Sequence, residues 1–226
     1  MNLKSHYKKL YSESISKIAS NDYEIDNLID SNKDNRFGIT LLIRPSIEIK
    51  ERIQEFIQRI KKIEPNQYYY PNSDIHITVM SIISCYEGFD IKMIDLGKYI
   101  ELTEKCLLEK KDINITFRGI TASPSGIMVQ GFMDNNALNN IRDRLRKEFK
   151  SSNLEQSLDK RYSIQTAHST IIRFRAELSQ KRELIKVLNE NINYHFGTFK
   201  VNKFELVYND WYHRKKYVNK IHEFST

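Results

Sequence analysis

The hydrophobic positions along this chain switch between helical and strand spacing in a regular order. Residues 38–46 form a short apolar run that ends at a proline, which predicts a strand. In residues 47–63, isoleucine and phenylalanine recur at three- and four-residue steps, the spacing of an amphipathic helix. Residues 74–83 predict a second strand, residues 94–110 a second helix and residues 113–120 a third strand.

The same order of elements follows in the second part of the chain. It predicts, in sequence, a strand over 126–133, a helix over 136–149, a polar loop over 151–166, a strand over 167–174, a helix over 179–192 and a strand over 198–208. We interpret the chain as a degenerate two-fold repeat in an α+β protein, with halves at about 37–121 and 125–208. Both halves belong to a single bilobal domain over 36–226.

Residues 1–35 stand before this repeat. Their apolar side chains follow a helical stripe that is formed by Leu3, Tyr7, Leu10, Tyr11, Ile15 and Ile18. A polar break, a short helical turn and a loop come next. We therefore expect an N-terminal helical extension over 1–35 that packs outside the main fold.

Two strands of the repeat carry a histidine with a threonine two residues later. These pairs are His76 with Thr78, and His168 with Thr170. Residues i and i+2 point to the same face of a strand, so each imidazole lies beside a hydroxyl. A single pair of this kind is most simply a histidine that is hydrogen-bonded within a half-buried sheet. Two pairs in matching slots of the repeat, 92 residues apart, favour a shared functional site instead.

Two imidazoles and two hydroxyls fit one type of reaction, in-line displacement at phosphorus. A neutral imidazole accepts a proton from the attacking oxygen, and an imidazolium donates one to the leaving oxygen. The threonine hydroxyls can donate hydrogen bonds to the non-bridging phosphate oxygens. With an ordinary histidine pKa near ~6.5, the rate should follow a bell-shaped curve around neutral pH. A phosphodiester with a neighbouring or good leaving oxygen requires no metal, so we expect no cofactor.

Composition adds limits and leaves one question open. The two cysteines, Cys85 and Cys106, form no Cys-x-x-Cys pair, and the histidines form no metal-binding pair. No apolar run reaches the ~20 residues that span a bilayer, and the N-terminus lacks an apolar signal segment. We therefore expect a cytoplasmic protein with no membrane partner. The formal charge of +7 favours an anionic partner, or it reflects a compositional bias of the source genome.

Over residues 36–212, the paired motifs "HITV" and "HSTI" resemble those of the 2H (two-histidine) phosphoesterase superfamily. That superfamily includes 2′-5′ RNA ligase-like proteins and 2′,3′-cyclic nucleotide phosphodiesterases. The resemblance implies a bilobal fold in which two antiparallel sheets face a central cleft, with helices outside. It also implies that His76, Thr78, His168 and Thr170 are the catalytic residues, with His168 as the base and His76 as the acid. Residues 1–35 have no counterpart in this pattern.

Several other residues are candidates for substrate binding. Arg44 and Arg173 lie near strand ends and could hold phosphate, although strand alternation places Arg173, like Arg175, opposite to His168. Tyr70, Tyr208 and Trp211 could stack on a base, although aromatic residues at strand ends are often part of the core edge.

The sequence favours a metal-independent phosphodiesterase that hydrolyses a 2′,3′-cyclic phosphate or a related cyclic or 2′-5′ nucleotide linkage. The expected partner is a nucleotide or RNA-end phosphodiester substrate, and we expect a monomer. One alternative is a 2′-5′ RNA ligase, which runs the same chemistry in reverse. Another is a non-catalytic module that binds RNA ends, although a pure binder has no need of both an acid and a base.

Overall fold

The computed structural model describes residues 2–107, 112–160 and 163–225. The helices are α1 (Leu3–Ala19), α2 (Ile47–Ile63), α3 (Leu96–Leu107), α4 (Ala137–Ser151) and α5 (Lys181–Glu190). The strands are β1 (Arg36–Ile43), β2 (Tyr68–Tyr69), β3 (Ile77–Glu87), β4 (Asn114–Ser123), β5 (Gly126–Met133), β6 (Ser169–Arg173), β7 (His195–Lys200), β8 (Lys203–Asp210) and β9 (Asn219–Ser225). The end of the helix predicted over 94–110, and residues 161–162 of the loop predicted over 151–166, lie outside the described residues.

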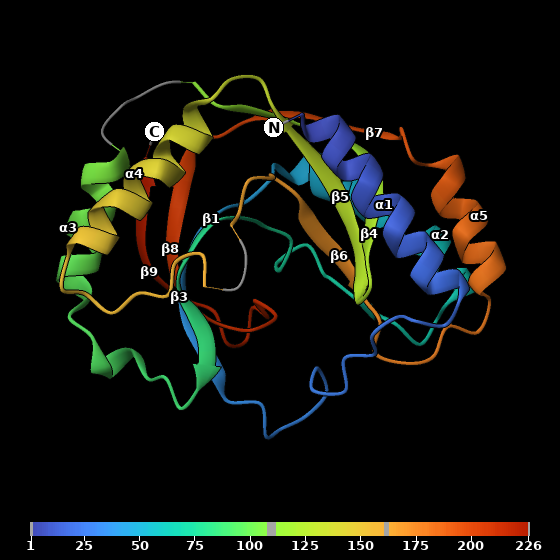
Figure 1. Ribbon diagram of the computed structural model, residues 1–226, viewed down its shortest axis with the longest axis horizontal. Coiled ribbons are helices and arrows are strands. Elements are labelled where there is room, and N and C mark those ends of the chain that lie inside the picture. Colours follow the sequence, from blue (N-terminus) through green and yellow to red (C-terminus); the bar gives the residue numbers. More distant parts are fainter. Residues whose placement is uncertain (1, 108–111, 161–162, 226) are drawn as a thin grey trace.

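The strands of these ranges form two antiparallel sheets, as the fold class predicted (Figure 1). Sheet A has the order β3-β1-β8-β9, and sheet B has the order β2-β6-β5-β4-β7. Helices α3 and α4 pack on the side of sheet A, whereas α1, α2 and α5 pack together on the side of sheet B. The chain is therefore an α+β protein in which helices lie outside two sheets.

Each sheet contains strands from both halves of the chain. The first half supplies β1 and β3 to sheet A, but its last strand, β4, pairs with β5 in sheet B. The second half supplies β5 and β6 to sheet B, but β8 pairs with β1 in sheet A. The two lobes are interleaved in this way through β4 and β8.

The single strand predicted over 198–208 corresponds to two strands, β7 and β8, which belong to different sheets. The apolar positions Phe199, Val201 and Phe204 are all buried, which gave the appearance of one continuous run. The step from Val201 to Phe204 is three residues rather than two, and the chain passes from β7 in sheet B to β8 in sheet A there. The backbone N–H of Val201 donates to the carbonyl of Ile113, which fixes the crossing point.

Helix α1 forms from the predicted stripe, but it is part of the core rather than an extension outside the main fold. Tyr7, Tyr11 and Ile18 are buried where α1 packs against β4 and α5. The Tyr7 hydroxyl donates to the carbonyl of Gly131 at 3.2 Å and accepts from the Gly131 N–H at 3.2 Å. Burial of two tyrosines and an isoleucine contributes several kcal/mol, at roughly 1.5–3 kcal/mol for each large side chain. Among the described helices, none is long and apolar enough to cross a bilayer.

Candidate functional site

Strand β3 is bulged, and the bulges decide which side chains face the cleft between the sheets. Thr78 pairs with Leu42 and Met80 pairs with Leu41, so Val79 has no partner on β1. An extra residue shifts the alternation of side chains by one position. In a regular strand, the side chains that face the cavity are two residues apart. Across a bulge, they are three residues apart. The register shifts twice more along β3, so that Ser81 and Ser84 line the same cavity as Thr78.

A bulge in β6 has the same effect in the other sheet. Thr170 pairs with Met128 and Ile172 pairs with Ile127, so the residue between them, Ile171, has no partner on β5. The extra residue returns Arg173 to the face that carries Thr170. Arg173 accordingly lines the cavity, and the expectation from strict alternation that it points away is wrong.

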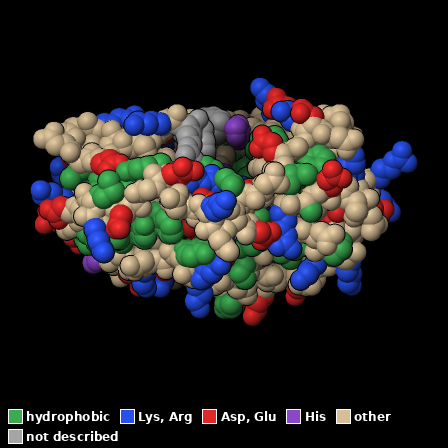
Figure 2. All heavy atoms as spheres, turned by 90° about the horizontal axis from the view of Figure 1, so that it is seen from below, with side chains coloured by type: hydrophobic (Ala, Val, Ile, Leu, Met, Phe, Trp, Pro, Cys, Tyr) green, Lys and Arg blue, Asp and Glu red, His purple; other side chains and the backbone are tan. Residues whose placement is uncertain are grey.

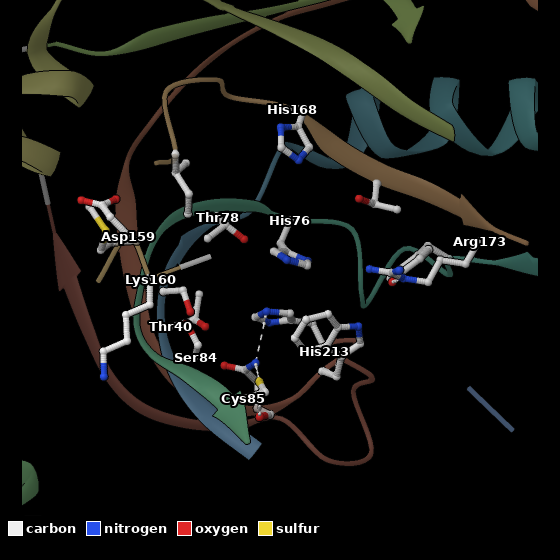
Figure 3. A pocket seen from close by; sticks show the side chains of 17 residues that line it. Thr40, His76, Thr78, Ser84, Cys85, Asp159, Lys160, His168, Arg173 and His213 are labelled. Carbon is white, nitrogen blue, oxygen red and sulfur yellow. Dashed lines mark hydrogen bonds between the residues drawn. The ribbon is translucent and has the colours of Figure 1, made fainter. Parts of the chain in front are cut away.

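The two His-x-Thr pairs meet in one cavity of about 150 Å³ between the sheets (Figure 3). His76 and Thr78 approach from sheet A, and His168 and Thr170 approach from sheet B. The four predicted catalytic side chains are therefore brought together, from segments that are far apart in the sequence. The glycine at 131 permits this approach, because a Cβ there would collide with the carbonyl oxygen of Ala167, the residue before His168.

His76 has a defined tautomer in its neutral form. Its Nδ1 lies 2.7 Å from the carbonyl oxygen of Asp74, which can only accept a hydrogen bond. Nδ1 therefore carries a proton, and Nε2 is left to accept or donate in the cavity. Burial lowers the pKa of His76 to about 4, and the carbonyl of Asp74 opposes this shift by stabilising the charged ring.

His168 has a different environment. Its Nδ1 lies 2.6 Å from the hydroxyl of Thr166, which can either donate or accept. Burial lowers the pKa of His168 to about 4, and the positive charge of Arg142 lowers it further. Among the described residues, no carbonyl opposes this shift for His168 as the Asp74 carbonyl does for His76. The positive charges of Arg44 and Arg173 likewise lower the pKa of His76, so both rings are held neutral to a similar degree and differ in the group that contacts Nδ1.

Three of the predicted binding residues also line the cavity: Tyr70, Arg173 and Trp211. The Nε of Arg173 donates to the Tyr70 hydroxyl at 3.0 Å, and its Nη1 is 3.7 Å from a carboxylate oxygen of Asp26. Asp26 belongs to the segment between α1 and β1. The N-terminal segment thus helps to orient a cation in the cavity. The guanidinium of Arg36 stacks 4.7 Å from the centre of the Trp211 ring.

The other two predicted binding residues, Arg44 and Tyr208, are not among the described residues that line the cavity. Arg44 forms an ion pair with Glu205 at 2.8 Å and donates to the carbonyl of Ser73 at 2.7 Å. Tyr208 stacks on Phe37, with ring centres 4.9 Å apart, and donates to the carbonyl of Phe89. Both side chains hold neighbouring segments in place.

His213 is a cavity residue that the sequence did not single out as a site histidine. It lies in the loop after β8 and has a positive φ of 56°, a conformation that residues other than glycine adopt rarely. Its Nε2 is 3.2 Å from Nδ2 of Asn209. Its signal in the sequence is the segment "YNDWYHR" at residues 208–214, where the histidine follows Tyr208 and Trp211, two of the predicted stacking residues.

Within the described ranges, no group of three or more His, Cys, Asp or Glu side chains is arranged to hold a metal ion. The surface in Figure 2 carries basic and acidic side chains that are interspersed rather than gathered in one patch. The net charge of +7 is therefore not concentrated on that face.

A sequence model of the AKAP7 2′5′ RNA ligase-like domain matches residues 37–223. The chain belongs to this family. It is accordingly a member of the 2H phosphoesterase superfamily, as the paired motifs predicted. The family match spans both His-x-Thr pairs and His213, but it begins after α1 and the loop that carries Asp26. No match to this chain was found among curated proteins.

Solved structures with the same fold cover most of the chain. TT0787 of Thermus thermophilus has a TM-score of 0.58 and 14% identity, and the match covers 83% of this chain and 97% of that chain. LigT of E. coli, solved in complex with 3′-AMP, has a TM-score of 0.57 and 16% identity, with 84% and 98% covered. The conserved protein of unknown function ATU0111 from Agrobacterium tumefaciens has a TM-score of 0.57 and 12% identity, with 92% and 98% covered. At such identities, the likeness concerns the fold of the family alone.

Proposed function

We propose that this chain is a metal-independent phosphodiesterase that hydrolyses a 2′,3′-cyclic phosphate or a related cyclic or 2′-5′ nucleotide linkage. The observation that carries the proposal is the meeting of His76 and His168, each with its threonine, in one cavity between the sheets. A titratable pair in a cleft, with hydroxyl donors beside it, matches the requirements of acid–base catalysis at phosphorus.

The surroundings of the two histidines support a division of roles. His168 is the base, because its Nδ1 faces the hydroxyl of Thr166 rather than a carbonyl oxygen, so its charged form has less support than that of His76. His76 is the acid, because the Asp74 carbonyl accepts from its Nδ1–H and so stabilises its charged form. A bound phosphodiester anion adds negative charge to the cavity, which raises the pKa of both rings and permits one of them to hold a proton near neutral pH.

In the proposed reaction, water attacks phosphorus in line with the leaving oxygen. Nε2 of His168 takes a proton from the water as the new P–O bond forms, and Nε2 of His76 gives its proton to the ribose oxygen as the old P–O bond breaks. The product is a phosphomonoester with a free ribose hydroxyl. The two imidazoles end in exchanged protonation states, so proton exchange with solvent is needed before the next turnover.

Three further side chains suit the binding of the phosphoryl group. The hydroxyls of Thr78 and Thr170 can donate to its non-bridging oxygens, where charge accumulates during the displacement. Arg173 supplies a cation that is already oriented by Tyr70 and Asp26. The complex of LigT with 3′-AMP supports a nucleotide as the ligand class for a protein of this fold.

The test is incubation of the purified protein with 2′,3′-cyclic nucleotides, cyclic oligonucleotides and 2′-5′-linked oligomers, followed by product mass. We expect a gain of one water for each linkage opened. His76→Ala and His168→Ala should each lower the rate by about 10² to 10⁴-fold while the fold is retained. His195→Ala is the matched control, because His195 is exposed in β7 and does not line the cavity.

Other results would assign the protein differently. A product that joins a cyclic phosphate to a 5′-hydroxyl would make it a ligase. Binding without any change of mass would make it an RNA-end binding module. Turnover that survives in the double variant of His76 and His168 would refute the proposed site.

A further inference from the structure

Helix α4 carries an arginine, Arg142, that is fully buried behind the two His-x-Thr pairs. Its relative exposure is 0%, and burial lowers its pKa to about 10. Burying a guanidinium is costly unless its N–H groups are all engaged, so arginine is among the residue types found least often in a protein interior. The position of this side chain therefore calls for an explanation from its contacts.

The guanidinium of Arg142 binds backbone carbonyls from both sides of the site. Nε donates to Val79 at 3.0 Å, and Nη2 donates to Thr78 at 3.2 Å and to Thr166 at 2.7 Å. Nη1 donates to Oδ1 of Asn139, one turn earlier in α4, at 3.2 Å. Among the described residues, its hydrogen-bond acceptors are thus three carbonyls and one amide, and none of them is a carboxylate.

The carbonyls of Thr78 and Val79 lie on β3, at the edge of sheet A, where no further strand can donate hydrogen bonds to them. β3 is the edge strand of sheet A, so one side of its backbone has no neighbouring strand. Val79 is the bulged residue that keeps Thr78 and Ser81 on the cavity face. Arg142 therefore supplies the donors that a next strand would have supplied, at the bulge on which the arrangement of the site depends.

The third carbonyl belongs to the other half of the site. Thr166 precedes β6, and its hydroxyl is the group that contacts Nδ1 of His168. One guanidinium thus connects the backbone at Thr78 to the backbone that orients His168. A planar fork with several fixed donors suits such a connection, whereas the single ammonium of lysine does not.

We propose that Arg142 is a positioning residue that sets the distance and orientation between the His76–Thr78 and His168–Thr170 pairs by binding the carbonyls of Thr78, Val79 and Thr166. This inference rests on the proposed phosphodiesterase function, because it concerns the geometry of that reaction. Arg142 does not line the cavity among the described residues, so it acts through the segments that it joins. A displacement of about 1 Å between reacting groups can lower the rate by about 10²-fold.

The experiment compares Arg142→Met and Arg142→Lys with Arg144→Met. Arg144 is the matched control, since it lies on the same helix and donates to the carbonyl of Cys106 on α3, away from the site. The kinetic constants are expressed per folded molecule, with the folded fraction taken from thermal melts. We expect Arg142→Met to lower kcat by about 100-fold and to change KM by less than about 3-fold. Arg142→Lys should lose about 10-fold in kcat, because it keeps the charge but not the fork.

A role in stability alone would reduce the folded fraction and leave kcat per folded molecule at the wild-type value, and that result would overturn the proposal. If Arg142→Met does not fold, the kcat of Arg142→Lys tests the proposal instead. A wild-type kcat in Arg142→Lys would then contradict the positioning role of Arg142. If the wild-type protein turns over none of the substrates, the proposed function fails separately. The imidazole nitrogen resonances of His76 and His168 then test the inference: they should shift in the Arg142 variants, and unchanged resonances would reject it.

Discussion

The imidazole rings of His76 and His213 lie 4.0 Å apart, centre to centre, with their planes tilted by 35°. Two charged imidazoles at this distance repel each other strongly in a site of low dielectric. Burial holds the pKa of His213 well below its usual value, and the charge of His76 lowers it further. The pair therefore binds one proton at most near neutral and mildly acidic pH, and His76 is the ring that is protonated.

The first prediction concerns this pair. Replacing His76 with glutamine removes the positive charge that opposes protonation of His213, so the pKa of His213 should rise. The measurement is titration of the imidazole resonances by NMR. Thr78→Ala is the control, because it changes the same wall of the cavity but no charge. An unchanged titration of His213 in His76→Gln would mean that the rings are not coupled.

The second prediction concerns the pH dependence of the rate. The pKa values of His76 and His168 are both about 4 in the free protein, rather than the value near ~6.5 expected from the sequence. One ring must be charged and the other neutral, so kcat/KM should be greatest near pH 4 to 5 and fall as the pH rises. A phosphodiester bound as proposed would raise both pKa values, so kcat should have its optimum at a higher pH. Coincident optima near pH 7 for both constants would contradict this expectation.

The third prediction concerns stability. The folded-state pKa of His168 lies below the unfolded value, so the unfolded chain binds more protons between about pH 4 and pH 6.5. The free energy of unfolding should therefore decrease as the pH falls through this range, by about 2 kcal/mol for this histidine between pH 7 and pH 5. His168→Gln should lose that part of the pH dependence in denaturant titrations. His195→Gln, at an exposed position, should keep the wild-type slope.

The fourth prediction concerns Arg173. Arg173→Met removes the cation that is proposed to bind the phosphate, and kcat/KM should fall by about 10- to 100-fold, since a hydrogen bond to a charged group contributes about 1.5–3 kcal/mol. Arg175→Met is the control, because Arg175 is exposed and donates to the carbonyl of Asn66 outside the cavity. Steady-state kinetics on the best substrate give both constants. Equal values for the two variants would remove Arg173 from the proposed site.

The fifth prediction concerns chelators. The proposed mechanism moves protons with two imidazoles and stabilises charge with hydroxyls and an arginine, so excess EDTA should leave the initial rate within about 2-fold of the untreated value. Loss of activity that one divalent ion restores would place the reaction in a metal-dependent class instead.

The two His-x-Thr pairs could be predicted from the sequence because local alternation and a repeat are enough to indicate them. The fold class could be predicted for the same reason, since α2 follows a helical spacing of apolar residues over 47–63 and β5 is a short, mainly apolar run over 126–133. Each motif and each element depends on residues that are neighbours in the chain, which periodicity reports directly, and the repeat is a match between two such local patterns.

The remaining features depend on contacts between distant segments. The bulges at Val79 and Ile171 leave no mark on composition, yet they place Ser81 and Arg173 in the cavity. His213 enters the site through a loop with positive φ, which a pattern of apolar residues cannot indicate. Arg142 resembles an ordinary charged residue of an amphipathic helix until β3 is known to be an edge strand.

The exchange of β4 and β8 between the sheets has a practical consequence. A chain severed in the turn at residues 124–125, between β4 and β5, would give two fragments that each lack strands from both sheets. Of the two histidines in the His-x-Thr pairs, the first fragment would carry only His76 and the second only His168. Neither fragment would hold a complete sheet or both His-x-Thr pairs. Under the proposed function, turnover would therefore report reassembly of the two fragments, and the protein could serve as a split reporter.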